Sequence, residues 1–235
     1  MKKKLEVIAT DVAHVIEANR LGVDRIELCS ALSSDGLSPS YGMVKWAVQN
    51  ADMPVMVMVR PREGDFVYTD QELDVMLDEV RWAKSCGAMG IVVGVLNQEN
   101  EVNILAMRRL VQLAYPMEVT FHRAMDVVMD PLKSLEEIID LGCTRILTSG
   151  QQSSCIVGKD LILEMQRQAG DRIVIMAGAG INAECIEEIK CNEIMEYHMS
   201  GLTRLDRCNR QEMVFGSTMV SRSTDISLVL EKLRT

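Results

Sequence analysis

The chain has 235 residues, of which 48% are hydrophobic and 25% are charged, and this balance excludes an intrinsically disordered chain. Its 25 basic and 34 acidic side chains give a net charge of −9, and no basic run follows Lys2 to Lys4, which excludes nucleic acid as an expected partner. The longest mainly apolar stretch, Met89 to Leu96, is too short to span a membrane, which takes roughly 18 residues. Because the amino end also lacks the apolar segment of a signal peptide, and no Cys-x-x-Cys pair occurs, we expect a cytoplasmic protein with reduced thiols.

Taken in chain order, β-rich runs alternate with segments of helical periodicity. The predicted strands are Leu5 to Ala9, Arg25 to Cys29, Val55 to Arg60, Gly90 to Leu96, Glu118 to Arg123, Arg145 to Ser149, Arg172 to Ala177 and Glu196 to Ser200. The predicted helices are Asp11 to Arg20, Ser40 to Asn50, Gln71 to Ser85, Glu101 to Ala114, Pro131 to Leu141, Gly158 to Ala169, Asn182 to Lys190 and Thr224 to Arg234.

Eight such repeats predict an α/β fold, a single (β/α)₈ TIM-like barrel over residues 1–235. Runs such as Ile173 to Met176 are apolar on both faces, which is typical of parallel strands buried between helices and a barrel interior. An open doubly wound sheet is the alternative, but no Gly-x-Gly-x-x-Gly follows the first strand.

Alternation along the strands places several charged residues on one face. Glu27 shares a face with Cys29, Arg60 ends the third strand, and His122 and His198 lie at the ends of the fifth and eighth. If these faces point into the barrel, the charges must pair with one another or with a ligand, because unpaired buried charge is costly. We therefore keep two interpretations: an ion-pair lattice that holds the barrel together, and an active site with Glu27, Arg60 and His122 as its catalytic residues.

Loops at the strand ends are suited to binding an anion. Glycines let backbone amides approach a ligand, hydroxyls donate hydrogen bonds, and barrels often bind phosphate after strands seven and eight. Besides Arg60, the residues predicted to bind an anion are Arg62, Ser149, Gly150, Gly178, Gly180, His198 and Ser200. Ordinary turn chemistry at Ser149 and Gly150, and pairing of Arg62 with nearby acids, remain open as structural alternatives.

Two further features concern proton transfer and metals. His122 is a candidate general acid or base, oriented by a carboxylate such as Asp126. The 17 methionines suggest copper, since soft sulfur ligands select Cu(I), but most of them lie in apolar runs where they would fill core space. Cys29 is the best single candidate for a metal thiolate, and one cysteine cannot hold Cu(I) alone.

Five strings in the chain closely resemble the CutC family, the copper homeostasis proteins. They are Asp24 to Cys29, Gly36 to Ser40, Val59 to Arg62 with Gly64 to Phe66, Thr120 to Ala124 with Asp126, and Arg145 to Gly150. The resemblance runs from the first strand through His198 and Ser200 and weakens from Gly201 onward. It implies a TIM-like barrel, a cytoplasmic location, a homo-oligomer and copper binding.

Carried over by position, the family's copper-linked cysteine corresponds to Cys29, and a second family cysteine falls at Ile8.

Three hypotheses for the function follow. The first is a cytosolic protein that binds copper as its cofactor or cargo, with Cys29 as the anchor. The second is a barrel enzyme that acts on a phosphorylated or carboxylated small molecule by acid–base chemistry. The third is a scaffold whose interior charges form only a structural lattice.

Overall fold

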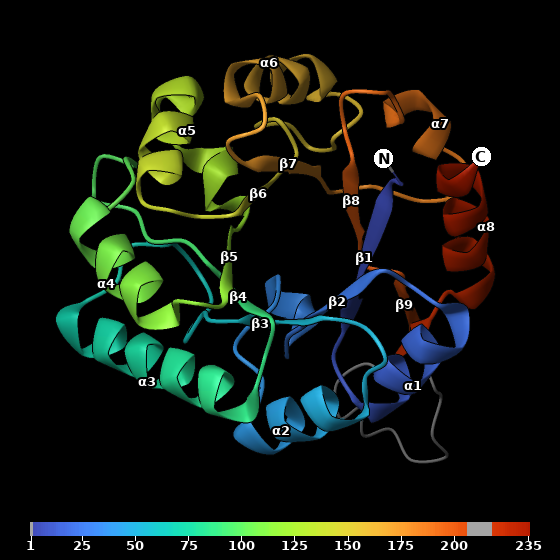
Figure 1. Cartoon of the computed structure of the whole chain (residues 1–235), viewed down its shortest axis with the longest axis horizontal. Coiled ribbons are helices and arrows are strands. Elements are labelled where there is room, and N and C mark those ends of the chain that lie inside the picture. The colour runs from blue at the N-terminus through green and yellow to red at the C-terminus, as the bar shows by residue number, and fades with distance from the viewer. Residues whose placement is uncertain (1, 206–217) are drawn as a thin grey trace, which may run out of the picture.

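The computed structural model describes residues 2–205 and 218–235, and in it eight parallel strands close into one barrel in the order β1 to β8 (Figure 1). The strands are β1 Lys4–Ala9, β2 Arg25–Leu28, β3 Val55–Met58, β4 Gly90–Val93, β5 Glu118–Phe121, β6 Arg145–Thr148, β7 Val174–Ala177 and β8 Glu196–Met199. β1 pairs with both β2 and β8, which closes the sheet. The predicted (β/α)₈ TIM-like barrel is therefore confirmed.

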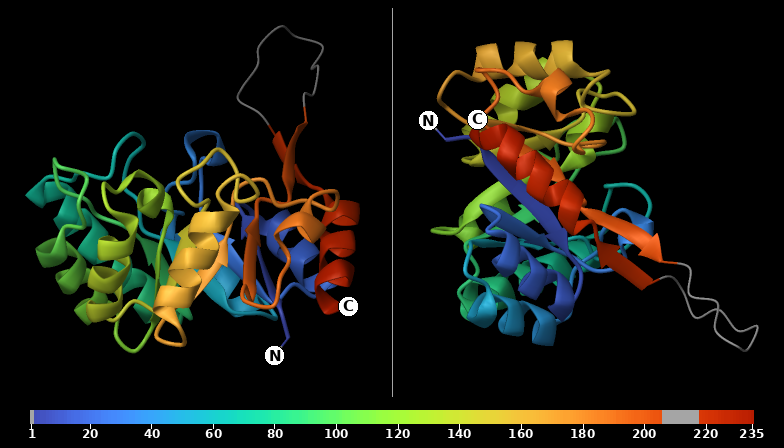
Figure 2. Two further views of the ribbon diagram at one scale, coloured as in Figure 1. Left: turned by 90° about the horizontal axis from the view of Figure 1, so that it is seen from above. Right: turned by 90° about the vertical axis from the view of Figure 1, so that its right-hand side faces the viewer.

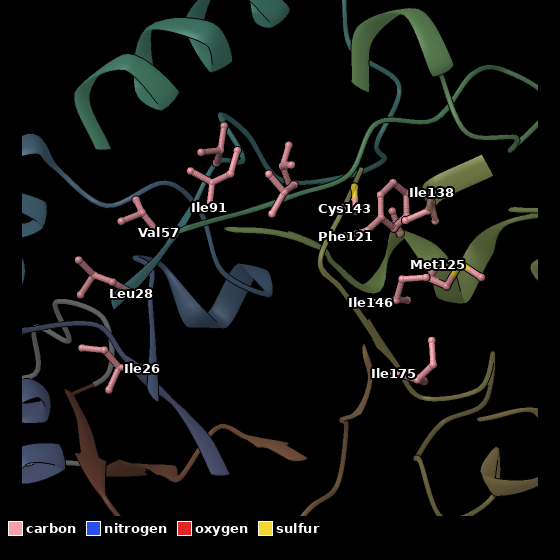
Figure 3. Close-up of a cluster of buried hydrophobic side chains, with 14 of the residues drawn as sticks. Ile26, Leu28, Val57, Ile91, Phe121, Met125, Ile138, Cys143, Ile146 and Ile175 are labelled. Atoms are coloured by element: carbon pink, nitrogen blue, oxygen red, sulfur yellow. The ribbon is translucent and has the colours of Figure 1, made fainter. Parts of the chain in front are cut away.

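Helices surround the barrel and bury their apolar faces against it (Figure 1). They are α1 Val12–Leu21, α2 Tyr41–Asn50, α3 Asp70–Cys86, α4 Ile104–Ala114, α5 Pro131–Asp140, α6 Lys159–Ala169, α7 Ile186–Ile189 and α8 Ser223–Arg234. Outward-facing strand residues such as Ile26, Val57 and Phe121 belong to the core cluster between the two layers (Figure 3). No helix in the described ranges is both long and apolar enough to cross a membrane.

Helix α3 shows how local sequence sets the element boundaries. Thr69 and Glu72 form a reciprocal capping box at its start, which satisfies two backbone N–H groups that the helix leaves unpaired. The helix ends at Gly87, whose φ of 84° is left-handed and is most easily adopted by glycine. Between these ends, apolar residues at three- and four-residue spacing, from Leu73 to Ala83, are buried against the barrel.

The predicted strands begin close to the observed ones but extend too far at their carboxyl ends. The third strand was expected to reach Arg60 and ends at Met58, and the fourth was expected to reach Leu96 and ends at Val93. The cause is a change of hydrogen-bond partner: the backbone N–H of Arg60 donates to the Ser38 hydroxyl at 2.8 Å instead of to a neighbouring strand. The polar residues at the strand exits therefore stand on loops that rim the barrel.

Two regions differ from the sequence expectation. The helix predicted from Asn182 is only the four-residue α7, because the Asn182 side chain accepts from the backbone N–H groups of Glu184 and Cys185 and so forms a turn first. In addition, β9 Leu202–Leu205 and β10 Thr218–Ser221 form an unpredicted antiparallel pair. This pair rises on the side of the barrel opposite the N-terminus (Figure 2). Two short 3₁₀ helices, η1 Leu32–Ser34 and η2 Arg123–Val127, complete the described elements.

Candidate functional site

A lattice of ion pairs crosses the barrel interior. The Arg25 guanidinium contacts Glu6 and donates to Glu196 at 2.7 Å, and Arg145 donates to Glu196 at 2.6 Å and to Glu118 at 3.1 Å. Burial alone would raise the pKa of Glu6 and of Glu196, but the neighbouring arginines outweigh it and lower both pKa values. These carboxylates are therefore ionised and paired, as the lattice interpretation expects for this part of the interior.

His198 connects the ion-pair lattice to Glu27. Its Nδ1 lies 2.7 Å from Glu6 Oε1, which fixes the orientation of the imidazole ring. Burial would lower the pKa of His198, but the charges of Glu27 and Glu6 raise it above its usual value. Ligand atoms of Glu6, Glu27 and His198 all lie within 4.8 Å of one another. His198 therefore sits between a satisfied carboxylate and a second acid, Glu27.

Glu27 differs from the lattice carboxylates because no ion pair holds it within residues 2–205 and 218–235. It is 3% exposed, and its Oε2 makes no hydrogen bond within the described part of the chain. Burial raises the pKa of Glu27 to about 7, even though the charges of His198 and Arg25 oppose the shift. A carboxyl group of this kind exchanges protons near neutrality, which is what a general acid or base requires.

Arg60 is held by backbone carbonyls instead of carboxylates. Its Nη1 donates to Ser34 O at 2.8 Å and Gly36 O at 3.1 Å, and its Nη2 donates to Gly64 O at 2.9 Å. The guanidinium also packs over the Phe66 ring at 5.2 Å. Among residues 2–205 and 218–235, its Nη groups donate to backbone carbonyls and not to a carboxylate, and its buried Nε has no hydrogen-bond partner. Its positive charge therefore remains available to an anion.

His122 is a buried, neutral hydrogen-bond donor. Burial and the charge of Arg60 lower the pKa of His122 to about 3, so the ring is uncharged at neutral pH. The backbone N–H of Ala124 donates to its Nδ1 at 3.2 Å, which assigns the ring proton to Nε2. That Nε2 is buried without a partner, and the ring packs 4.8 Å from Phe66. The prediction that Asp126 orients His122 is wrong, because the backbone of the loop orients the ring.

Asp126 instead fixes the loop after β6. It accepts from the Thr148 hydroxyl at 2.5 Å and from the Ser149 backbone N–H at 2.9 Å, and it pairs with Arg123 at 2.7 Å. Thr148 and Asp126 thus clamp two neighbouring strand exits together. The sequence does not distinguish a contact between Asp126 and the loop after β6 from one between Asp126 and His122, because that loop and His122 both lie at the end of a strand.

Glu27, Arg60, His122 and His198 line one cavity of about 540 Å³ at the carboxyl end of the barrel. Of the loop residues predicted to bind an anion, Gly180 and Ser200 also line it, whereas Arg62, Ser149, Gly150 and Gly178 do not. Residues of the wall that the sequence analysis did not single out include Phe66, Arg123, Ala179 and Arg222. Ala179 has a φ of 72°, a strained conformation for a residue with a side chain. Residue propensities do not predict this left-handed conformation at an alanine.

The four remaining candidates make structural contacts. Arg62 donates to Glu72 at 2.6 Å and Asp65 at 3.0 Å, and the Ser149 hydroxyl donates to Gln152 O at 2.7 Å. A Cβ at Gly150 would lie 2.2 Å from Gly158 O, and a Cβ at Gly178 would lie 2.5 Å from Leu147. The two glycines therefore permit close packing where any side chain would clash.

Cys29 does not line the cavity, although Ile8 and Met58 of the apolar cluster around it do. It is fully buried in a cluster with Ile8, Met56 and Met58, and burial together with the charge of Glu27 raises the pKa of its thiol. Cys29 is not part of the three-residue group of possible metal ligands formed by Glu6, Glu27 and His198. The sulfur-containing neighbours are nevertheless the soft donors that Cu(I) prefers. Cys29 thus fits a copper site only together with thioethers.

Comparisons with known proteins identify the family. The model of the CutC family matches residues 3–203. A family protein CutC from Pasteurella multocida (strain Pm70) is 46% identical and aligns over 84% of this chain and 82% of its own length. The copper homeostasis protein cutC homolog of Homo sapiens is 39% identical over 95% of this chain and 81% of its own length. The crystal structure of a CutC protein from Streptococcus agalactiae superposes with a TM-score of 0.79 at 31% identity, covering 84% of this chain and 98% of that one.

Proposed function

We propose that this chain, which belongs to the CutC family, binds a small phosphorylated or carboxylated molecule in the barrel cavity and acts on it by acid–base chemistry. One observation carries the proposal: Glu27, Arg60 and His122 all line the cavity, and each carries a buried polar atom that has no hydrogen-bond partner among the described residues. Each buried polar atom left unpaired costs about 1–3 kcal/mol, and a ligand that bonds to all three would offset that cost.

The chemistry of the three groups specifies the ligand. Arg60 Nε and His122 Nε2 are both donors, and Arg60 carries a full positive charge, so the matching groups are anionic or carbonyl oxygens. The Glu27 carboxyl, in contrast to these donors, can accept a proton and return it. A small molecule with an anionic oxygen and an acidic hydrogen satisfies all three residues.

The scaffold hypothesis explains the lattice but not these three groups. Glu6, Arg25, Arg145 and Glu196 satisfy one another without any contribution from Glu27. A purely structural interior gains nothing from an unpaired carboxyl, an uncompensated guanidinium and an unpaired imidazole N–H around one cavity. The interior therefore combines a structural lattice with a separate ligand-binding layer above it.

A thermal-shift screen under reducing conditions tests this proposal, with inorganic phosphate, sugar phosphates and small carboxylates as the probes. A ligand that binds the folded chain raises its melting temperature. We expect a rise with at least one anion, and we expect it to vanish in Arg60→Ala and weaken in His122→Gln. Arg81→Ala, which removes an exposed arginine paired with Asp78, is the matched control and should respond like wild type. An equal rise in Arg60→Ala and wild type would refute the site.

We also propose Cu(I) binding as a second function, favoured by the cluster that contains Cys29, Met56 and Met58. The relatives' name, copper homeostasis protein, supports it. Ile8 lies in the same cluster, at the position where the resemblance expects a second cysteine, so this chain offers one thiol where the family pattern offers two.

Competition for Cu(I) against bicinchoninate, without oxygen, tests the copper proposal. Cys29→Ser should abolish binding, Cys86→Ser should leave it unchanged, and Ile8→Cys should raise the affinity by supplying a second thiolate. Stoichiometric binding in Cys29→Ser would exclude this site.

Cytoplasmic residence and self-association follow from the same family resemblance as further proposals. Sedimentation velocity of the purified chain tests self-association.

A further inference from the structure

From the placement of donors and base around the cavity, we propose that the chain catalyses enolisation: it removes a proton from a carbon next to a carbonyl group of an anionic substrate. This inference rests on the proposed function and specifies its reaction. It assigns Glu27 as the base, with Arg60 and His122 as the donors that stabilise the oxygen of the enolate.

The donors form one side of the site. The Arg60 guanidinium lies 5.2 Å from the centre of the Phe66 ring, and the His122 ring packs 4.8 Å from the same ring. Phe66 thus spaces the two donors and shields them from water. A fixed cation and a fixed neutral N–H in a buried site stabilise a developing negative charge without reorganising, and removing one such donor typically costs on the order of 100-fold in rate.

The base lies deeper than the donors. Glu27 stands within β2, paired in register with Ile8 and Met56, whereas Arg60 and His122 stand beyond the ends of β3 and β5. β5 lies across the barrel from β1 and β8, which supply Glu6 and His198 (Figure 1). We therefore place the ligand with its oxygens at the donors of the rim and its carbon atoms toward Glu27.

In the described part of the chain, no donor bonds to Glu27 Oε2. Its neighbours on β1 and β8, Glu6 and His198, bond to each other, and Arg25 is committed to Glu6 and Glu196. The Glu27 oxygen is consequently free to contact a substrate hydrogen. By contrast, the lattice carboxylates are occupied by guanidinium groups and cannot act as the base.

The step balances without any cofactor. The C–H bond breaks and the proton moves to Glu27 Oε2, while the electron pair of that bond forms a carbon–carbon double bond. The carbonyl π pair moves to its oxygen, where the N–H groups of Arg60 and His122 stabilise the charge. Return of the proton to carbon regenerates a carbonyl compound. In D₂O the protonated Glu27 exchanges with solvent, so the substrate gains deuterium.

Proton NMR in D₂O tests the inference directly, with dihydroxyacetone phosphate and pyruvate as the phosphate and carboxylate probes. Wild type should exchange the C–H signal of at least one probe faster than buffer alone. Glu27→Gln should lose about 100-fold or more of that exchange, because the amide cannot accept the proton. Glu63→Gln, at an exposed glutamate that accepts from Ser34, is purified identically and should exchange like wild type.

The outcomes separate this inference from the proposed function. A probe that binds with dependence on Arg60 but shows no enzyme-dependent exchange overturns enolisation and leaves anion binding intact. Exchange that persists equally in Glu27→Gln also overturns it. Circular dichroism melting of each variant identifies loss of folding, and His122→Gln, expected to slow exchange while Glu27 is present, gives a second variant should Glu27→Gln fail to fold.

Discussion

His122 illustrates how one residue couples the site to the stability of the chain. Its folded pKa of about 3 lies below its ordinary value of 6.5, because burial and Arg60 oppose protonation. Between these two values the unfolded chain binds a proton that the folded chain cannot bind. Stability must therefore fall as the pH is lowered through this range.

We expect His122→Gln to lose less stability on acidification than wild type. From the two pKa values, the histidine alone removes about 2 kcal/mol between about pH 7 and about pH 5. Urea unfolding of both proteins at the two pH values measures the difference, and all other titrating groups are common to both. An equal loss of unfolding free energy in the two proteins would mean that His122 takes up a proton in the folded chain over this pH range.

At the same scale, the sequence predicted which side chains face inward but not which of them pair. Strand alternation placed Glu27, His122 and His198 on interior faces, and all three line the cavity. Their partners come from strands far apart in the sequence: the carboxylate that orients His198 is Glu6, 192 residues away. The expected partner of His122, Asp126, was wrong because backbone contacts are not encoded by side-chain identity.

Elements were predicted well where periodicity and caps agree. The helix expected over Gln71 to Ser85 is observed as Asp70–Cys86, because its capping box and its terminal glycine are both local signals. The β9–β10 pair was missed because four-residue strands across a long connection carry no periodic signal. The strand ends were overextended for a related reason: loop residues such as Val59 are as apolar as strand residues.

The capping box of α3 fixes the start of that helix. Thr69→Ala removes the acceptor for the Glu72 backbone N–H and should destabilise the chain by about 1 kcal/mol. Thr69→Ser keeps the hydroxyl and is the control. Urea midpoints of the three proteins measure the effect. Because Thr69 does not line the cavity, anion binding should not change, and a change in binding would show that the helix start communicates with the Arg60 loop.

Across the whole molecule, the ion lattice ties together strands that close the barrel. Glu196 on β8 accepts from Arg25 on β2 at 2.7 Å and from Arg145 on β6 at 2.6 Å. One carboxylate is therefore shared by two buried guanidinium groups, and it adds to the backbone pairing of β1 with β8 that closes the barrel. Glu27, on the same strand as Arg25, is outside this set of bonds.

The contrast between these two glutamates gives a paired prediction. Glu196→Gln leaves two buried guanidinium groups without their shared counter-charge and should destabilise the chain by about 3–5 kcal/mol. Glu27→Gln has the same shape change in the same barrel but removes an unpaired acid, so it should leave stability unchanged or increase it. Chemical unfolding of both variants at neutral pH measures the two values. Comparable losses of unfolding free energy in the two variants would place Glu27 in the lattice and give the interior a purely structural role. If Glu196→Gln destabilises the chain and Glu27→Gln stabilises it, the barrel retains Glu27 at a cost to its own stability, which a ligand-binding role explains.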